Sequence, residues 1–190
     1  LANQDFHFDI RIFEPNDFTR IIHPDLKLIR HSHIEGDFST QNQFVNLTGY
    51  IPEFQFGKFK AKSMDLEAIA ESGFFDFEMN VDQVYNGDSL WIDTLQILTQ
   101  TTANKDFRFD MLVADKRKFN YANITAFITP KTDKTLIRLE PSDIKLANYK
   151  WHFDSGNAIF VQGKKITSQG LVFRSAEQKI YIDSYLKNDT

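Results

Sequence analysis

The sequence predicts an all-β protein of short, mainly antiparallel strands, arranged as a sandwich, a barrel or an extended curved sheet. Apolar residues recur at every second position in segment after segment, which is the period of a half-buried strand. These segments return at roughly 12 to 20 residue intervals, too close for parallel strands joined by crossover helices. Few segments show a helical period, so at most one or two short helices are expected.

The alternation sets the expected strands in chain order. We expect about a dozen of them. The clearest are residues 6–12, 34–38, 74–81, 90–92, 107–113, 149–153, 158–161 and 180–182. Polar turns that contain Asn or Gly separate the strands, as at residues 84–88, 154–157 and 162–164.

Two segments carry residues that favour a helix. Residues 14–23 are expected to form a short one, because Asn16 or Asp17 can cap its first turn and Pro24 ends it. Residues 64–71 contain helix formers, but their leucine and alanines also alternate. We therefore expect this second segment to be a strand.

Length and composition indicate a single β-rich domain over residues 1–190. Apolar residues make up 42% of the chain, which is enough for a sizeable core, and 19 residues are Phe. No Pro-rich linker or shift in composition divides the chain. The chain has no initiator Met or signal peptide and begins within a few residues of a strand, so we expect it to be excised from a longer protein.

Charge and cysteine content exclude several classes of function. The formal net charge of −4 and the scattered Lys and Arg residues argue against a nucleic-acid partner. The absence of cysteine excludes disulfides, thiolate catalysis and cysteine-ligated zinc.

One segment holds the residue types of a metal site. His31 and His33 are candidate metal ligands, because with Glu35 and Asp37 they would share one face of a strand. The favoured interpretation is that these side chains form the solvated face of a half-buried strand. Carboxylates at residues 76 and 78, two apart, and at 106 and 110, four apart, also fall on one face of a strand and have the same explanation. We therefore expect no enzyme, no catalytic residue and no cofactor.

A sheet with one apolar face needs something to cover that face. Since at most one or two short helices are expected, either two sheets cover each other or a ligand covers one sheet. The first case is a β-sandwich, which we keep as the alternative fold.

The order of sequence landmarks resembles the C-terminal region of the TamB-like proteins, the inner-membrane component of the translocation and assembly module and relatives of the AsmA-like group. The resemblance is one of pattern and spans most of the chain. It rests on residues 6–10, the turn at 15–18, residues 24–26, the strand at 34–38, residues 86–90, residues 139–146 and the segment 149–153.

This resemblance implies a fold, a location and partners. It implies one extended, curved and mainly antiparallel sheet, a β-taco or trough with an apolar interior. The segment would then lie in the periplasm of a Gram-negative bacterium, anchored in the inner membrane through a part of the protein outside this sequence. It also implies that an apolar groove carries phospholipid acyl chains, or serves outer-membrane protein assembly, next to an outer-membrane β-barrel assembly protein of the TamA/BamA type.

We expect one set of apolar side chains to line such a groove. They are Phe8, Ile10, Phe77, Met79, Val81, Phe107, Phe109, Met111, Val113, Ile124 and Ile128. Trp91 and Trp151 are large enough to fill the groove instead of lining it.

Two other functions stay open. The chain could be an assembly module that adds a strand from an outer-membrane protein to its sheet edge. It could instead be a carbohydrate-binding sandwich, in which Trp91, Trp151, Tyr50 or Tyr85 stack on sugar rings.

Overall fold

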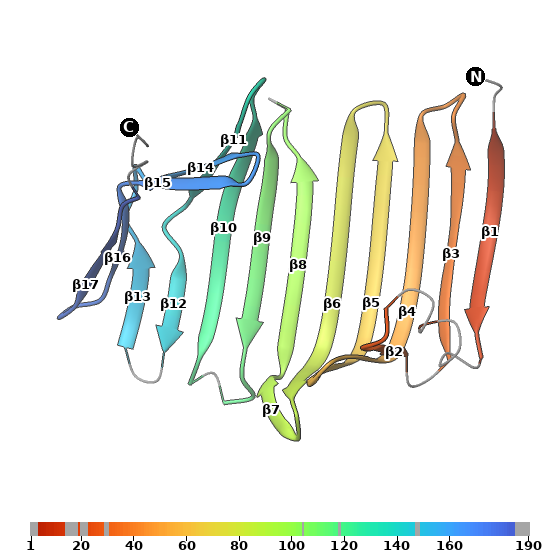
Figure 1. Ribbon diagram of the computed structural model, residues 1–190, viewed down its shortest axis with the longest axis horizontal. Helices are drawn as coiled ribbons and strands as arrows, with labels where there is room; N and C mark the ends of the chain where they lie inside the picture. Colours follow the sequence, from red (N-terminus) through yellow and green to blue (C-terminus); the bar gives the residue numbers. More distant parts are fainter. Residues whose placement is uncertain are drawn as a thin grey trace.

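The computed structural model describes residues 4–13, 19, 23–28, 31–103, 105–117, 119–146 and 149–184. Within these residues the protein is all-β: its strands form one large, open, antiparallel sheet that is not closed into a barrel (Figure 1). The predicted fold class is confirmed. The alternative β-sandwich is wrong, because the strands of the described residues belong to one connected sheet instead of two sheets facing each other.

The described residues form seventeen strands, more than the dozen expected from alternation. The first nine are β1 (Asp5–Ile12), β2 (Leu26–Leu28), β3 (Ser32–Ser39), β4 (Phe44–Phe56), β5 (Phe59–Glu71), β6 (Phe74–Asn86), β7 (Ser89–Ile92), β8 (Thr94–Thr101) and β9 (Phe107–Ala114). The others are β10 (Tyr121–Pro130), β11 (Thr135–Leu139), β12 (Asp143–Leu146), β13 (Tyr149–Phe153), β14 (Ala158–Gln162), β15 (Lys165–Gln169), β16 (Leu171–Arg174) and β17 (Lys179–Ile182).

The main body of the sheet is a meander of neighbouring antiparallel strands. Its order is β1, β3, β4, β5, β6, β8, β9 and β10, and these strands lie side by side in Figure 1. The short strand β2 pairs with one end of β4, and β7 pairs with one end of β6. Sequential hairpins are the simplest way to join antiparallel strands, which explains why short polar turns suffice along most of the chain.

The sheet divides at its C-terminal end. Strand β10 pairs with β11 along one half and with β12 along the other. One branch continues through β14 and β15, and the other through β13, β16 and β17. The hairpin of β14 and β15 runs across the direction of the other strands in Figure 1.

The two helix candidates have different outcomes. The predicted strand at residues 64–71 is confirmed, because it forms most of β5. The predicted helix at residues 14–23 lies almost entirely outside the described residues. Among the described residues no helix has the length and apolar character needed to cross a membrane.

Only a small part of the protein is fully buried. In the described residues the buried apolar side chains are Ile51, Ala61, Val81, Ala126, Ile144, Trp151 and Val172. Three of them, Ile144, Trp151 and Val172, lie on β12, β13 and β16 and mark the C-terminal corner of the sheet. There the Trp151 ring stacks on the Phe173 ring, with centroids 4.7 Å apart. Few side chains are enclosed because no second layer of described residues covers the long strands.

A single amide side chain links the two branches of the sheet. Asn157 is only 3% exposed. Its Oδ1 accepts a hydrogen bond from the Leu139 backbone N–H at 2.8 Å, and its Nδ2 donates to the Leu139 carbonyl at 2.8 Å and the Asp154 carbonyl at 2.7 Å. The amide therefore satisfies backbone groups at the end of β11 and just after β13, one in each branch.

We expect Asn157→Ala to lower the free energy of unfolding by about 2 to 3 kcal/mol, because buried backbone groups lose their partners. Urea denaturation followed by circular dichroism measures this change. Asn123→Ala is the matched control: Asn123 is an exposed strand residue, and its loss should change stability by less than about 0.5 kcal/mol. Equal costs for the two variants would show that the Asn157 amide does not hold the branches together.

Candidate functional site: the apolar face of the sheet

The pairing register sorts the side chains of the long strands onto two faces. Residues directly opposite each other on neighbouring strands share a face, and successive residues of one strand alternate between faces. One face carries four transverse rows, which we call the apolar face. The rows are Phe6, Phe38, Val45, Ala70, Phe75, Thr101, Phe107 and Ile128; Phe8, Gly36, Leu47, Ala68, Phe77, Thr99, Phe109 and Ala126; Ile10, Ile34, Gly49, Leu66, Met79, Ile97, Met111 and Ile124; and Ile51, Met64, Val81, Leu95, Val113 and Ala122.

The structure brings the eleven predicted lining residues together. All of them lie on the apolar face, on β1, β6, β9 and β10. The predicted set of lining residues left out the residues that β3, β4, β5 and β8 contribute to this face. Their alternation is present in the sequence, but glycines in β3 and β4 and threonines in β8 interrupt it.

Much of the apolar face is accessible to solvent. Apart from a few buried positions such as Val81 and Ala126, its side chains are half-buried or exposed. At the β1 edge, Phe6 is 51% and Ile10 45% exposed. Figure 1 shows the main body of the sheet as one layer of strands, so these side chains are shielded mainly by their neighbours within the sheet. An apolar surface of this extent on a protein indicates a site of interaction.

Side chains on the apolar face pack sideways over glycines. A methyl group built at Gly36 would lie 2.8 Å from the Phe8 ring and closer still to the Asn46 carbonyl oxygen. At Gly49 it would lie 3.1 Å from the Leu66 side chain. The glycines thus let larger neighbours lie flat against the sheet, which keeps the apolar face continuous across these positions.

The two tryptophans lie in different places. Trp151 is 9% exposed and lies opposite Ile144, so it fills the C-terminal end of the apolar face. Trp91 is 55% exposed on β7, where its ring centroid is 5.8 Å from that of Phe59. Strand β7 pairs only with the end of β6, so Trp91 lies at the margin of the sheet and leaves its middle open.

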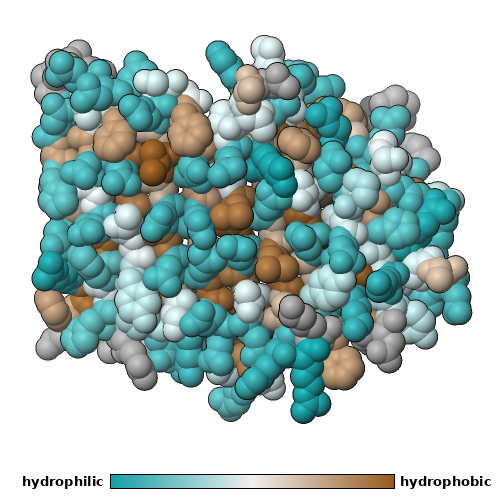
Figure 2. Space-filling view, turned by 180° about the vertical axis from the view of Figure 1, so that it is seen from behind, coloured by the Kyte–Doolittle hydropathy of each residue, from teal (hydrophilic) through white to brown (hydrophobic). Residues whose placement is uncertain are grey.

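The opposite face of the sheet is polar. Its central row is Asp9, Glu35, Thr48, Glu67, Glu78, Leu98, Asp110 and Thr125. Seen from behind, the molecule is mostly hydrophilic, with hydrophobic residues in small separate patches (Figure 2). The sheet therefore has one wetted face and one apolar face, as the alternation predicts.

One of the two metal candidates joins a cluster on the polar face. The ligand atoms of Asp9, His33 and Glu35 lie within 4.8 Å of one another, and His33 Nε2 is 3.0 Å from Asp9 Oδ1. Arg11 donates from Nε and Nη2 to both oxygens of Asp9, at 3.1 and 2.8 Å, and this contact lowers the pKa of the Asp9 carboxyl. A guanidinium already holds the carboxylate that a cation would need, so the cluster is explained as an exposed ion-pair network.

His31, the other metal candidate, lies apart from this cluster. Its ring meets the edge of the Phe13 ring, with centroids 5.4 Å apart. Sequence reasoning paired His31 with His33, whereas the structure pairs His33 with Asp9 on the neighbouring strand. Strand register, which decides that pairing, is not visible in the local spacing.

The closely spaced carboxylates bind neighbouring side chains on the polar face. Burial raises the pKa of Asp110, but hydrogen bonds from Arg108 and from Thr125 Oγ1 outweigh it, and the pKa is lowered overall. Asp76 accepts a hydrogen bond from Gln100 Nε2 at 3.0 Å. These carboxylates are structural ion-pair and hydrogen-bond partners, with no arrangement typical of a general acid and base.

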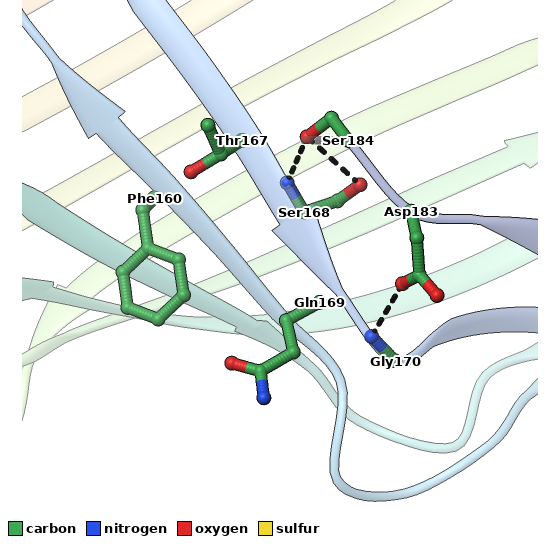
Figure 3. Close-up of a pocket in the computed structure, with 7 residues that line it drawn as sticks. All are labelled: Phe160, Thr167, Ser168, Gln169, Gly170, Asp183 and Ser184. Carbon is green, nitrogen blue, oxygen red and sulfur yellow. Dashed lines mark hydrogen bonds between the residues drawn. The ribbon is translucent and has the colours of Figure 1, made fainter. Parts of the chain in front are cut away.

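A shallow pocket of about 490 Å³ lies beside the β14–β15 hairpin (Figure 3). Its lining residues are Phe160, Thr167, Ser168, Gln169, Gly170, Asp183 and Ser184. Ser184 Oγ accepts a hydrogen bond from the Ser168 N–H at 2.6 Å, and Asp183 Oδ1 accepts one from the Gly170 N–H at 2.9 Å. The lining residues include no histidine or lysine, and the Asp183 carboxylate binds the Gly170 N–H, so these polar groups serve the local turn.

The aromatic residues considered for sugar stacking do not converge. Tyr50 is exposed on the polar face, Trp91 lies on β7, and Trp151 is buried in the C-terminal corner. The Tyr85 ring has the Lys62 ammonium 5.0 Å from its centroid. The structure therefore offers no shared aromatic platform among these four residues.

Family models, curated proteins and solved structures were compared with the chain, and none of them matches it. The resemblance to the TamB-like family is therefore a proposal. The fold and the apolar face are established by the residues of this chain alone.

Proposed function

We propose that this chain is a non-catalytic segment that binds phospholipid acyl chains along its apolar face. The observation that supports this most is the continuous apolar surface of the main sheet, which no second layer of described residues covers. A soluble monomer rarely leaves an apolar surface of such extent in water without a partner for it.

Binding to the apolar face would also remove the acyl chain from water. Each methylene group taken out of water contributes about 0.8 kcal/mol, so a chain of about 16 carbons costs on the order of 12 kcal/mol to expose. A strip of apolar side chains lowers this cost along its whole length without any chemical step. An extended sheet is suited to this role because its rows run across many strands.

Side-chain size along the apolar face gives such a strip a shape. In the row that begins at Phe8, large side chains on β1, β4, β6 and β9 alternate with Gly36, Ala68, Thr99 and Ala126 on the strands between them. In this row and in the row that begins at Phe6, strands β5 and β8 therefore carry small side chains between larger neighbours, whereas larger residues stand there in the other two rows. Acyl chains fit best over β5 and β8 in these two rows, where the rings of β6 and β9 flank them.

Met79 and Met111 add adaptability to the same surface. They lie in one row on either side of Ile97. Methionine is unbranched and polarizable, so it can follow chains of different length and unsaturation. This favours binding of a class of lipids over binding of one molecule.

The resemblance to TamB-like proteins adds a location to the proposal. By that resemblance, the segment lies in the periplasm of a Gram-negative bacterium, in a protein that bridges the inner membrane and an outer-membrane β-barrel assembly protein. Phospholipid would then pass along the apolar face between the two membranes. This part of the proposal rests on the resemblance alone.

The proposal is tested by purifying the chain from a bacterial host without detergent and extracting it with organic solvent. Mass spectrometry then measures phospholipid against protein. We expect a near-stoichiometric amount of phospholipid. Lipid-free, monodisperse protein would contradict the proposal, because it would mean that the apolar face is satisfied by its own side chains or by another copy.

A further inference from the structure

Among the described residues, strand β1 lies at an edge of the sheet. It pairs with β3 on one side, and no strand of the described residues pairs with its other side. The Gln4 carbonyl accepts a hydrogen bond from the Thr40 N–H at 2.9 Å, so the even-numbered residues of β1 point their backbone groups toward β3. The odd-numbered residues from Asp5 to Arg11 therefore present theirs at the free edge.

This edge carries charged residues on its polar side but lacks the other usual features that prevent pairing. Its eight residues contain no Pro, Gly or Lys, and its register with β3 is regular from end to end. On its apolar side Phe6 and Ile10 are about half exposed. A long, regular and partly apolar edge is a template for another strand.

The sequence of β1 is complementary to itself in antiparallel pairing centred on Phe8. Asp5 then lies opposite Arg11 of a second copy, and His7 lies opposite Asp9. On the other face Phe6 lies opposite Ile10, and the two Phe8 rings lie opposite each other. Opposite charges and aromatic–aliphatic pairs at directly facing positions each stabilise a sheet.

Neighbouring registers do not have this property. The odd-numbered residues carry the backbone groups at the edge, so odd-numbered residues of one copy must face odd-numbered residues of the other. The nearest registers that meet this condition are centred on His7 or on Asp9. Centring on His7 places Asp5 opposite Asp9, and centring on Asp9 places two aspartates opposite each other. Like charges at directly facing positions destabilise both alternatives.

We propose that two copies of this chain pair through β1, antiparallel and centred on Phe8, across a two-fold axis. The second copy is the occupant because each facing odd-numbered pair joins an aspartate to Arg11 or to His7. Within one copy Arg11 binds Asp9 and His7 lies 3.0 Å from Asp37, so pairing across the edge extends these exposed contacts. Antiparallel pairing in this register keeps the apolar faces of both copies on the same side, so the dimer has one continuous apolar face. The inference does not depend on lipid binding and holds or fails separately from the proposed function.

Single cysteines test the register, because the chain has no cysteine of its own. The variants His7→Cys and Asp9→Cys, mixed and oxidised, should form a disulfide dimer, since these positions face each other at about 5.5 Å between Cα atoms. His7→Cys alone should give little dimer, because its two copies are displaced by two residues along the strands, about 7 Å. A dimer from Asp9→Cys alone would overturn the proposed register.

Analytical ultracentrifugation of the unmodified chain tests the dimer itself. We expect a monomer–dimer equilibrium in the micromolar range. Asp5→Arg should weaken it by about tenfold, because the two Asp5–Arg11 pairs become pairs of like charge. A monomer at all concentrations, or a monomer with a host peptide bound at β1, would overturn the proposal; the second result would point to an assembly module that adds client strands.

Discussion

Phe109→Asp is expected to remove most bound phospholipid from the protein while the sheet stays folded. Phe109 lies on β9 in the middle of the apolar face, between Thr99 and Ala126. An acyl chain that lies along β8 would displace water from a carboxylate at this position, and this desolvation costs free energy. We therefore expect bound lipid to fall by about tenfold or more. Because Phe109 is only half-buried, the carboxylate can remain hydrated in the lipid-free protein.

The same strand supplies a matched control. Leu112 is also a half-buried apolar residue of β9, but it lies on the polar face between Gln96 and Asn123. Leu112→Asp should leave bound phospholipid unchanged, as measured by mass spectrometry of extracted protein, with circular dichroism to confirm the fold. Equal lipid loss in both variants would contradict a face-specific site, and unfolding of Phe109→Asp would show that Phe109 is a core residue.

Gly36→Val should produce the largest loss of stability among substitutions in the main sheet. The Cβ of valine would collide with the Asn46 carbonyl oxygen, which is backbone, and with the Phe8 ring. Strands β1 and β4 would both have to move away from β3. We expect the free energy of unfolding to fall by about 3 kcal/mol or more, measured by chemical denaturation.

Gly49→Ala is the matched control for this effect. Its new methyl group would meet only the Leu66 and Ile34 side chains, at 3.1 Å and beyond, and these can shift. A cost of about 1 kcal/mol or less is expected. An equally small loss of stability in Gly36→Val would contradict the close approach of Phe8 and the Asn46 carbonyl to Gly36.

Alternation predicted the all-β class and part of the apolar face, but it did not distinguish an open sheet from a sandwich. Period two along β1, β6, β9 and β10 placed eleven side chains on one face because every second residue of a strand must face the same way. The same logic would have reached β4 and β8, but Gly49, Thr99 and Thr101 break the apolar run at those strands. Larger side chains of the neighbouring strands pack over these small or polar residues. That packing depends on which strands pair, which the sequence of one strand does not reveal.

The sequence could not show what covers the apolar face. Alternation is the same in a sandwich and in an open sheet, since each has one buried or ligand-facing side. The choice depends on long-range pairing, and here each long strand pairs with the next, so the sheet extends sideways instead of folding back. For the same reason the grouping of Asp9 with His33 was missed, because it depends on the register of β1 against β3.

Photo-crosslinking tests most directly whether acyl chains lie on the apolar face. The photoreactive residue p-benzoyl-L-phenylalanine would replace Phe109 in one protein and Leu112 in another, and each would be irradiated in phospholipid vesicles or in the host cell. We predict a mass shift of one phospholipid on the protein carrying the probe at position 109 and none at position 112. Adducts at both positions, or at neither, would contradict lipid binding by the apolar face.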